Sequence, residues 1–495
     1  RPNPMVGFHV LQGVEEVNTP RPPAGHITHV RPVLHASMHI FWHQRDLRIP
    51  DNRGLTLATA DDTTLPVYVV DPDLLKQIGT RQRAFLLNGV RKLRERYREL
   101  DSELVVRSGA PSEVLAELVD ATDADQVYYN THYRPARRNR QRRVDDAVPT
   151  ESATDLVLVD PGRLESDYPN HSRFYDDWQD EHKLQPSGTP DADALASVAG
   201  GTDGTIPEVD ADIDLPEAGY RAARDRYDRF LDAGIESYND TRDDMRLAVE
   251  RPIGGVSRLS PYLAAGMIGI REVWADASER HNLASGNAAR NVGKYRYELS
   301  WREQNYHLLY HNPTLLVDNY IDIPNPIEWE DDDEHFEAWK RGETGYPFID
   351  AGMRQLNTEG YIHNRPRQNV ASFLTKHLLT DWRKGARYFT RQLIDHDPAS
   401  NHGNWQWIAS TGTDSVDVRI FDPVAQLSKY DDGAHYVKAY VPELRDVPAG
   451  KIVEWPNLSR AERERLAPAY PHPIVDRNEA YDRAQRTFER ALGKR

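Results

Sequence analysis

The sequence predicts a two-domain protein, a doubly wound parallel α/β domain followed by a mostly α-helical domain. Three observations carry this prediction. A chain of 495 residues is too long for one ordinary hydrophobic core. Short apolar runs alternate with helical stretches as far as Val159, which is the pattern of a parallel sheet. Beyond Tyr220 the chain is rich in helical patterns and aromatic residues and has few candidate strands.

The α/β pattern begins at Met38 and consists of five expected strands with helices between them. The expected helices are Arg81–Leu100 and Pro111–Leu118. The expected strands are Met38–Trp42, Leu65–Asp71, Glu103–Arg107, Gln126–Asn130 and Asp155–Val159.

The boundaries of the domains follow from changes in composition. Residues 1–37 are rich in Pro, Gly and His and lack the apolar core and cleavage site of a signal peptide, so we expect an N-terminal extension. Residues 38–184 form the expected α/β domain. Residues 185–219 are mostly Pro, Gly, Ala, Ser and Asp and are expected to be a linker. Residues 220–495 form the expected helical domain.

Composition excludes several classes of chemistry. The chain has no cysteine, which rules out disulfides, iron–sulfur clusters and cysteine nucleophiles. Its histidines lack metal-ligand spacing, so no metal site is expected. No apolar run approaches the roughly 20 residues of a membrane helix, and we expect a cytoplasmic protein without membrane contact.

The formal net charge of −16 argues at first against a nucleic-acid partner, since phosphate binding needs a basic footprint. Asp and Glu are spread along the whole chain, however, as expected for a uniformly acidic surface. High net charge keeps a protein soluble in concentrated salt. We therefore expect a halophilic source, with a local basic site hidden in the net charge. The arginine-rich run 134–143 is the densest positive charge, and we favour a solvated helix face over a role in attracting DNA.

The run from Asp395 to Asp414 is the strongest functional signal, since it combines carboxylates, an amide and two indoles. Carboxylates and amides can fix the polar edge of a flat cofactor, while indoles can stack on a base or carry an electron. The run resembles the signature of the photolyase/cryptochrome family. The resemblance includes Met38–Arg48, Gly255–Tyr262 and Val441–Leu444 and covers most of the chain. It implies an α/β antenna-binding domain and an all-α FAD-binding domain.

The turn Gly254–Pro261 offers backbone N–H groups, two hydroxyls and a guanidinium, which together can hold a phosphate. On the residues alone, a helix cap is the commoner role of such a turn. The resemblance implies that it holds the flavin pyrophosphate, with Val256 in place of a threonine. The flavin contacts that the resemblance implies are Tyr238, Val256, Ser257, Arg258, Leu259, Ser260, Tyr295, Glu298, Arg302, Asn364, Arg367, Asp395, Asp397 and Asn401.

The resemblance also implies a catalytic set at the damaged DNA bases. Without it, Trp301 would be a core residue, and Glu298 and Arg302 a surface pair at helical spacing. Stacking of an indole on an extruded base contributes about 1–3 kcal/mol, comparable to the few kcal/mol lost on base flipping. The implied catalytic residues are Glu298, Asn364, Asn401, Trp301 and Trp407, and the implied DNA contacts are Arg302, Arg365 and Arg419.

Trp405, Trp382 and Trp329 match the family's tryptophan triad, an electron-hopping chain from the flavin to the surface. Without the resemblance they would be ordinary core residues.

Several positions that face the lesion in the family depart from its pattern. The loop Ser415–Val418 is one residue shorter than in the repair enzymes and adds the acid Asp417. An added carboxylate near phosphate opposes DNA binding. Further departures are Gln304, Asn305, Tyr361, Gln368 and Asp422.

The favoured function is that of a class I-type photolyase, a deoxyribodipyrimidine photo-lyase. In that mechanism excited reduced FAD donates an electron to a flipped-out cyclobutane pyrimidine dimer of UV-damaged DNA. The alternative is a cryptochrome-like blue-light photoreceptor that photoreduces FAD without repairing DNA. A third interpretation, a flavin dehydrogenase, fits the composition but not the triad. We expect a monomer with an antenna chromophore, either a folate or a deazaflavin.

Overall fold

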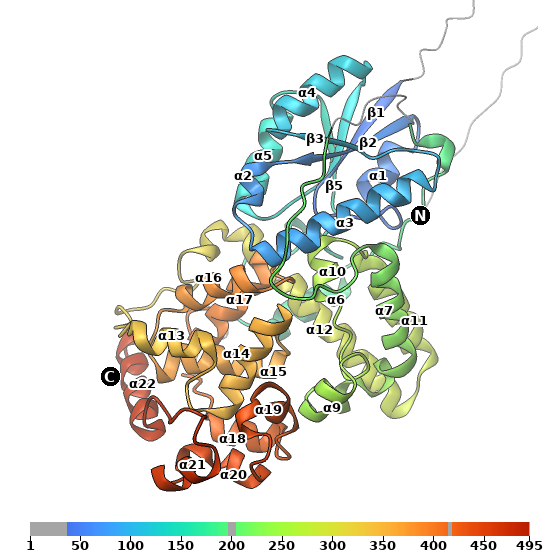
Figure 1. Ribbon diagram of the computed structural model, residues 1–495. Helices are drawn as coiled ribbons and strands as arrows, with labels where there is room; N and C mark the ends of the chain where they lie inside the picture. Colours follow the sequence, from blue (N-terminus) through green and yellow to red (C-terminus); the bar gives the residue numbers. More distant parts are fainter. Residues whose placement is uncertain (1–36, 197–203, 414–417, 495) are drawn as a thin grey trace, which may run out of the picture. The chain divides into compact units, whose positions relative to one another are not determined.

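The computed structural model describes residues 37–196, 204–413 and 418–494. The expected extension 1–37 lies outside the described residues except for Ser37. The described chain belongs to one compact unit, in which a sheet is followed by many helices (Figure 1).

The sheet of the described chain has five parallel strands in the order β3-β2-β1-β4-β5. The chain therefore winds from β1 to one edge of the sheet and then from β4 to the other. All neighbouring strands pair in parallel, which confirms the predicted doubly wound sheet. The strands are β1 (Met38–His43), β2 (Thr63–Val70), β3 (Val105–Ser108), β4 (Gln126–Asn130) and β5 (Thr150–Ala153).

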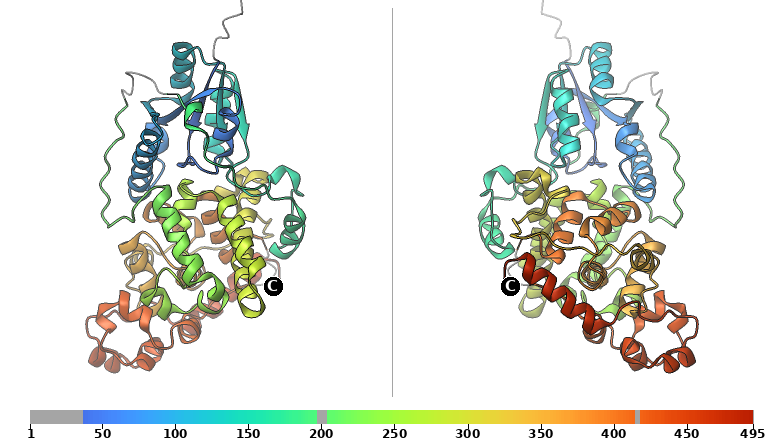
Figure 2. Two further views of the ribbon diagram at one scale, coloured as in Figure 1. Left: turned by 90° about the vertical axis from the view of Figure 1, so that its right-hand side faces the viewer. Right: turned by 90° about the vertical axis from the view of Figure 1, so that its left-hand side faces the viewer.

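Helices lie on both faces of the sheet (Figure 2), because successive side chains of a strand point to opposite faces. Phe41 of β1 shares one core with Leu55 and Phe85. Its neighbour Trp42 shares a second core with Leu115. The covering helices are α1 (Arg53–Ala58), α2 (Pro72–Leu75), α3 (Thr80–Arg98), α4 (Pro111–Thr122) and α5 (Pro135–Asp145).

The fifth strand lies earlier in the chain than predicted. It is Thr150–Ala153, whereas Asp155–Val159 forms no strand, so that prediction was wrong. The N–H groups of Leu158 and Val159 donate instead to the Glu303 carboxylate, at 2.7 and 3.3 Å. A short apolar run shows burial, but periodicity alone does not show what buries it.

The arginine-rich run 134–143 lies at α5, and its predicted solvated face is wrong for two arginines. Arg137 and Arg140 are only 4% and 7% exposed. Arg140 Nε lies 2.7 Å from the carboxylate of Asp71, which follows β2. This helix therefore turns part of its positive charge toward the protein interior.

Residues 185–219, the expected linker, contact the α/β part at several points outside the undescribed stretch 197–203. Leu195 forms a parallel bridge with Thr64 of β2. The Asp212 carboxylate accepts hydrogen bonds from the Arg81 guanidinium at 2.7 and 2.8 Å. The segment therefore lies against the α/β part at Leu195 and at Asp212.

The remaining described chain is helical, as predicted. One π-helical turn, Phe373–His377, lies between α15 and α16. The helices are α6 (His171–Asp180), α7 (Tyr220–Ala233), α8 (Tyr238–Thr241), α9 (Met245–Glu250), α10 (Ser260–Ala265), α11 (Ile270–Leu283), α12 (Gly286–His311), α13 (Asp333–Arg341), α14 (Pro347–Glu359), α15 (Asn364–Ser372), α16 (Trp382–Gln392), α17 (Pro398–Ala409), α18 (Pro423–Tyr430), α19 (His435–Tyr440), α20 (Ala449–Val453), α21 (Arg460–Leu466) and α22 (Arg477–Ala491).

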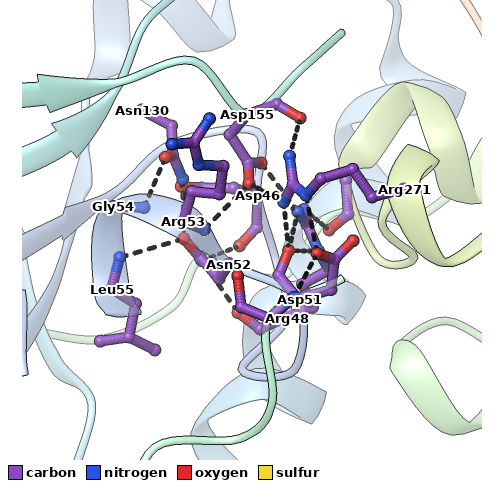
Figure 3. Close-up of polar contacts among 12 residues, drawn as sticks. Asp46, Arg48, Asp51, Asn52, Arg53, Gly54, Leu55, Asn130, Asp155 and Arg271 are labelled. Carbon is purple, nitrogen blue, oxygen red and sulfur yellow. Dashed lines mark hydrogen bonds and ion pairs between the residues drawn. The ribbon is translucent and has the colours of Figure 1, made fainter. Parts of the chain in front are cut away.

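A buried network of charges joins the loop after β1 to α11 (Figure 3). Arg271 of α11 donates to the Asp51 carboxylate at 2.8 Å and to the Asp155 carboxylate at 2.6 Å. Arg48 reaches the same Asp155 carboxylate at 2.8 and 2.9 Å. Burial alone would raise the pKa of Asp155, but Arg48 and Arg271 outweigh burial and hold that pKa well below its usual range. The network fixes α11, which packs against α12.

Candidate functional site

Two adjoining cavities lie among the helices. The first cavity measures about 230 Å³ and the second about 570 Å³. Ser260, Tyr361, Asn364 and Trp407 line both of them. Most of the candidate residues line one or both cavities, namely Tyr238, Val256, Ser257, Arg258, Leu259, Ser260, Glu298, Trp301, Arg302, Asn364, Arg367, Asp395, Asn401, Trp405 and Trp407.

The loop before α10 brings unpaired backbone donors to the second cavity. Among the described residues, the N–H groups of residues 256–260 have no backbone carbonyl as acceptor. Arg258 has a φ of 48°, uncommon for a residue with a side chain. Its guanidinium donates to Glu359 at 2.9 Å and lies 4.4 Å from the centre of the Tyr361 ring. Free N–H groups beside a fixed guanidinium suit an anion.

A carboxylate and an amide meet at the first cavity. Asp395 accepts a hydrogen bond from the Ser260 hydroxyl at 2.7 Å, and Arg367 lies 3.2 Å from the same carboxylate. Asn401 is held by its Nδ2, which donates to the Ala386 carbonyl at 3.1 Å. Arg367 therefore pairs with Asp395, and the pair lies beside an amide fixed in place.

Glu298 and Arg302 lie on α12 at the second cavity, and each pairs with another residue. Glu298 lies 2.8 Å from Lys294 Nζ and also pairs with Arg242. Arg302 lies 3.2 Å from Glu303. Burial opposes the charge of Arg242, but the neighbouring Glu298 carboxylate outweighs burial and raises the pKa of Arg242. Glu298 is therefore held at the cavity by two cations.

The indoles of Trp301 and Trp407 both line the second cavity. Trp301 stacks on His171, with ring centres 3.6 Å apart and planes inclined by 8°. The Arg419 guanidinium lies 4.5 Å from the centre of the Trp407 ring. Trp407 Nε1 is buried and has no hydrogen-bond partner within the described chain. The two indoles expected to stack on bases thus share a cavity. One face of Trp301 is in contact with His171, and the Trp407 ring is in contact with Arg419.

Two of the triad tryptophans, Trp405 and Trp382, belong to one hydrophobic cluster, and Trp329 packs against it. Trp405 lines the first cavity. Trp382 is fully buried, with its Nε1 donating to Asn319 at 3.1 Å. Trp329 is partly exposed and packs on Phe488. Trp405 thus lies at a cavity wall, Trp382 lies in the core, and Trp329 is partly exposed.

Besides Trp329, Trp382 and Arg419, three candidate residues lie outside the walls of both cavities. Asp397 caps α17 and pairs with Arg45 at 3.1 Å. Burial alone would raise the pKa of Asp397, but Arg45 and the hydrogen bonds to the carboxylate outweigh burial and lower this pKa to about 2. Tyr295 is buried beside Tyr238, with ring centres 5.2 Å apart. Arg365 donates to Asp243 at 2.5 Å.

The sequence interpretation missed Arg242, Asp243, Lys294 and His171. Lys294 precedes Glu298 by one helical turn, a spacing that could have predicted their ion pair. His171 is far from Trp301 in the sequence, and no spacing rule connects them. The prediction about the shortened loop is not tested, since residues 414–417, which include Asp417, lie outside the described residues.

An α/β sheet followed by helices that enclose a polar cavity with an anion-binding loop defines a class of protein that binds a large nucleotide cofactor. Residues 39–195 match the family model described as DNA photolyase, and residues 295–490 match the FAD binding domain of DNA photolyase. The chain therefore belongs to the photolyase/cryptochrome family, as the sequence resemblance predicted.

Relatives and solved structures agree with this assignment. A deoxyribodipyrimidine photo-lyase of Halobacterium salinarum is 41% identical over 92% of this chain and 100% of the relative. A class III photolyase from Agrobacterium tumefaciens has a TM-score of 0.81 and 32% identity, covering 94% of this chain and 100% of that one. A cryptochrome of Synechocystis sp. PCC6803 has a TM-score of 0.83 and 26% identity, covering 92% and 100%. The haloarchaeal relative fits the source expected from the acidic composition.

Among the described residues, no helix is long and apolar enough to cross a bilayer. No cluster of three or more His, Cys, Asp or Glu side chains is placed to hold a metal ion in that part of the chain.

Proposed function

We propose that the chain is a class I-type photolyase that uses light to repair cyclobutane pyrimidine dimers in DNA. One observation carries the proposal. Glu298, Asn364, Trp301 and Trp407 line a single cavity, which adjoins the one lined by Asp395 and Asn401. A reaction between a cofactor and an extruded lesion needs these two sets of residues side by side.

The residues present fit FAD. The N–H groups of residues 256–260, which have no backbone acceptor within the described chain, and the Arg258 guanidinium suit its phosphates. Asp395, Arg367 and Asn401 suit the polar edge of its flat ring system. When bound, FAD supplies the absorption of light and the one-electron chemistry.

The protein's own groups bind and orient the lesion. We assign hydrogen bonding of the bases to Glu298 and Asn364, and stacking to Trp301 and Trp407. Lys294 and Arg242 hold the Glu298 carboxylate at the cavity wall. Within the described chain the Asn364 side chain is exposed and has no hydrogen-bond partner, so that its amide is available to a base.

We further propose that Trp405, Trp382 and Trp329 conduct electrons between the cofactor cavity and the surface. Their change from cavity wall to core to partial exposure supports this route. Arg302, Arg365 and Arg419 are the proposed contacts to DNA. We propose that the protein is a monomer and that its partner is UV-damaged DNA. The cytoplasm is the proposed compartment, because it would contain that DNA.

The domain boundaries remain a proposal, with an α/β domain over 38–184, a linker over 185–219 and a helical FAD-binding domain over 220–495. The α/β part is the proposed place of an antenna chromophore, a folate or a deazaflavin.

The deciding experiment measures loss of a thymine cyclobutane dimer from single- and double-stranded DNA. Purified protein with reduced FAD is illuminated with blue light in high salt, and a dark sample is the control. Light-dependent loss of the dimer supports the photolyase. Absence of repair in a sample whose FAD still photoreduces contradicts it.

A cryptochrome-like photoreceptor is the second candidate. Asn305, Tyr361 and Gln368 depart from the repair enzymes, and all three line the second cavity. The altered residues thus lie where a lesion would bind. The repair experiment separates the two functions, because a photoreceptor would photoreduce FAD and leave the dimer intact.

A further inference from the structure

The imidazole of His171 covers one face of the Trp301 indole. Their ring centres are 3.6 Å apart and their planes differ by 8°, a nearly parallel stack. His171 is the first residue of α6, whose Asn170 cap accepts a hydrogen bond from the Arg173 N–H at 3.0 Å. A residue on a capped helix, far away in the sequence, thus fixes a ring that lines the second cavity.

Two hydrogen bonds fix the orientation of the imidazole. Its Nδ1 lies 2.9 Å from the Tyr297 hydroxyl and its Nε2 lies 2.9 Å from the Ser300 hydroxyl. Ser300 donates its only hydroxyl hydrogen to the Tyr297 carbonyl at 2.7 Å. The Ser300 oxygen therefore accepts from Nε2–H, while Nδ1 accepts from the Tyr297 hydroxyl.

This arrangement keeps the imidazole neutral and immobile. The ring is buried, with His171 only 3% exposed. Burial, with a smaller contribution from Lys294, lowers the pKa of His171 to about 3. Both ring nitrogens have partners on α12, the helix that carries Trp301, so that the stack moves with that helix as a unit.

We propose that His171 is a positioning residue that makes Trp301 a one-faced stacking platform for an extruded pyrimidine base. The imidazole occupies one face of the indole, so that a base entering the cavity can stack only on the other face. Fixing the indole in advance removes the cost of ordering it when the base arrives. The inference deepens the proposed function and rests on it.

The test compares the affinity of five variants for single-stranded DNA with one thymine dimer. An aromatic pair contributes enough for about a two- to tenfold change in affinity. His171→Ala should weaken binding by that factor, whereas His171→Phe, which restores a flat ring, should bind within twofold of the unmodified protein. In the background of Trp301→Ala, adding His171→Ala should change the affinity no further. His182→Ala, an exposed histidine shortly after α6, is the matched control and should have no effect.

Two further readouts separate positioning from a general structural role. FAD content and the rate of FAD photoreduction should both stay at the level of the unmodified protein in His171→Ala. If this variant does not fold, the Phe variant and Tyr297→Phe, which removes the partner of Nδ1, carry the test. Tyr297→Phe should weaken binding less than twofold.

The outcomes distinguish the two proposals. An unmodified protein that fails to distinguish dimer-containing from undamaged DNA refutes the proposed function itself. If that protein does distinguish them, equal affinity of His171→Ala overturns the inference. A loss of affinity in His171→Phe as large as in His171→Ala also overturns it, and so does an independent effect of His171→Ala in the Trp301→Ala background.

Discussion

Replacing Arg271 by Met removes the cation at the centre of the buried network (Figure 3). Arg271 is 1% exposed and makes hydrogen bonds with the side chains of Asp51 and Asp155 and with both of their backbone carbonyls. Methionine has a similar length and no charge, so the variant tests the ion pairs with little change of packing.

The expected loss in the free energy of unfolding is about 3–5 kcal/mol, the usual result of breaking a buried ion pair from one side. Asp155 keeps Arg48 as a partner at 2.8 Å. Asp51 keeps backbone donors, namely the Ser187 N–H at 3.1 Å and the Glu272 N–H at 3.4 Å. The Asp51 carboxylate, however, loses the Arg271 guanidinium. This loss of a charged partner accounts for most of the expected decrease in the free energy of unfolding.

Urea unfolding at constant high salt, followed by tryptophan fluorescence, measures this loss. Arg221→Met is the control, because Arg221 is 73% exposed in its pair with Glu99 and should change stability by less than about 0.5 kcal/mol. Asp51→Asn completes a double-mutant cycle, since Asn tolerates the left-handed backbone of Asp51, whose φ is 50°.

The reasoning is refuted if Arg271→Met lowers the free energy of unfolding by no more than Arg221→Met does. The pH dependence gives a second check. The folded-state pKa of Asp155 lies below the ordinary 3.8, so its contribution is present above that pH and is lost as the pH falls toward the folded value. The difference in the free energy of unfolding between the unmodified protein and Arg271→Met should therefore become smaller in acid.

Three further predictions concern other parts of the chain. Glu298→Ala should lower the yield of dimer repair and leave FAD bound, and unchanged repair would remove Glu298 from the mechanism. Trp382→Phe should slow the photoreduction of FAD and leave repair by chemically reduced protein unchanged, and unaltered photoreduction would exclude Trp382 from the electron route. Lys376 is fully buried, and its amine donates to the Ala409 carbonyl and the Ser410 hydroxyl. Burial lowers the pKa of Lys376 well below 10.5. Stability should therefore rise with pH by about 1.4 kcal/mol per unit while the folded amine is neutral and the unfolded one charged. Lys376→Met should lose this slope, and parallel pH profiles would refute the assignment.

The sequence predicted most of the sheet because its strands are short apolar runs with clear boundaries. Gln126–Asn130 was placed correctly at both ends. Asp155–Val159 was misplaced because the N–H groups of Leu158 and Val159 donate to the Glu303 carboxylate of α12 and not to a neighbouring strand, whereas the sequence shows only that the run is apolar. Arg137 was placed on a solvated face for a related reason, since an arginine-rich helix gives no sign of which side is covered.

Most of the residues that line the cavities could be predicted, because the family resemblance supplied them, but their partners could not. Helical spacing alone would pair Glu298 with Arg302, whereas Arg242, which directly follows α8, pairs with Glu298 from outside α12. His171 reaches Trp301 only through the packing of α6 on α12. Contacts between distant segments depend on tertiary geometry, which spacing rules do not contain.

The cations around the second cavity are already paired with carboxylates, and this bears on how an acidic protein can bind DNA. Arg365 pairs with Asp243, Arg258 with Glu359, and Glu298 with both Arg242 and Lys294. A phosphate must therefore compete with a carboxylate of the protein for each cation.

We accordingly expect the salt dependence of DNA binding to be shallower than the number of cations suggests, since few new phosphate contacts would form. Asp243→Asn frees Arg365, and it should tighten binding and steepen the slope of log K against log salt by up to about 0.9 on double-stranded DNA. Asp232→Asn is the control, because that carboxylate is 75% exposed in a surface pair with Arg280. If Asp243→Asn changes neither affinity nor slope while the protein still binds DNA, Arg365 does not contact phosphate. Its pair with Asp243 then only joins α15 to the segment between α8 and α9.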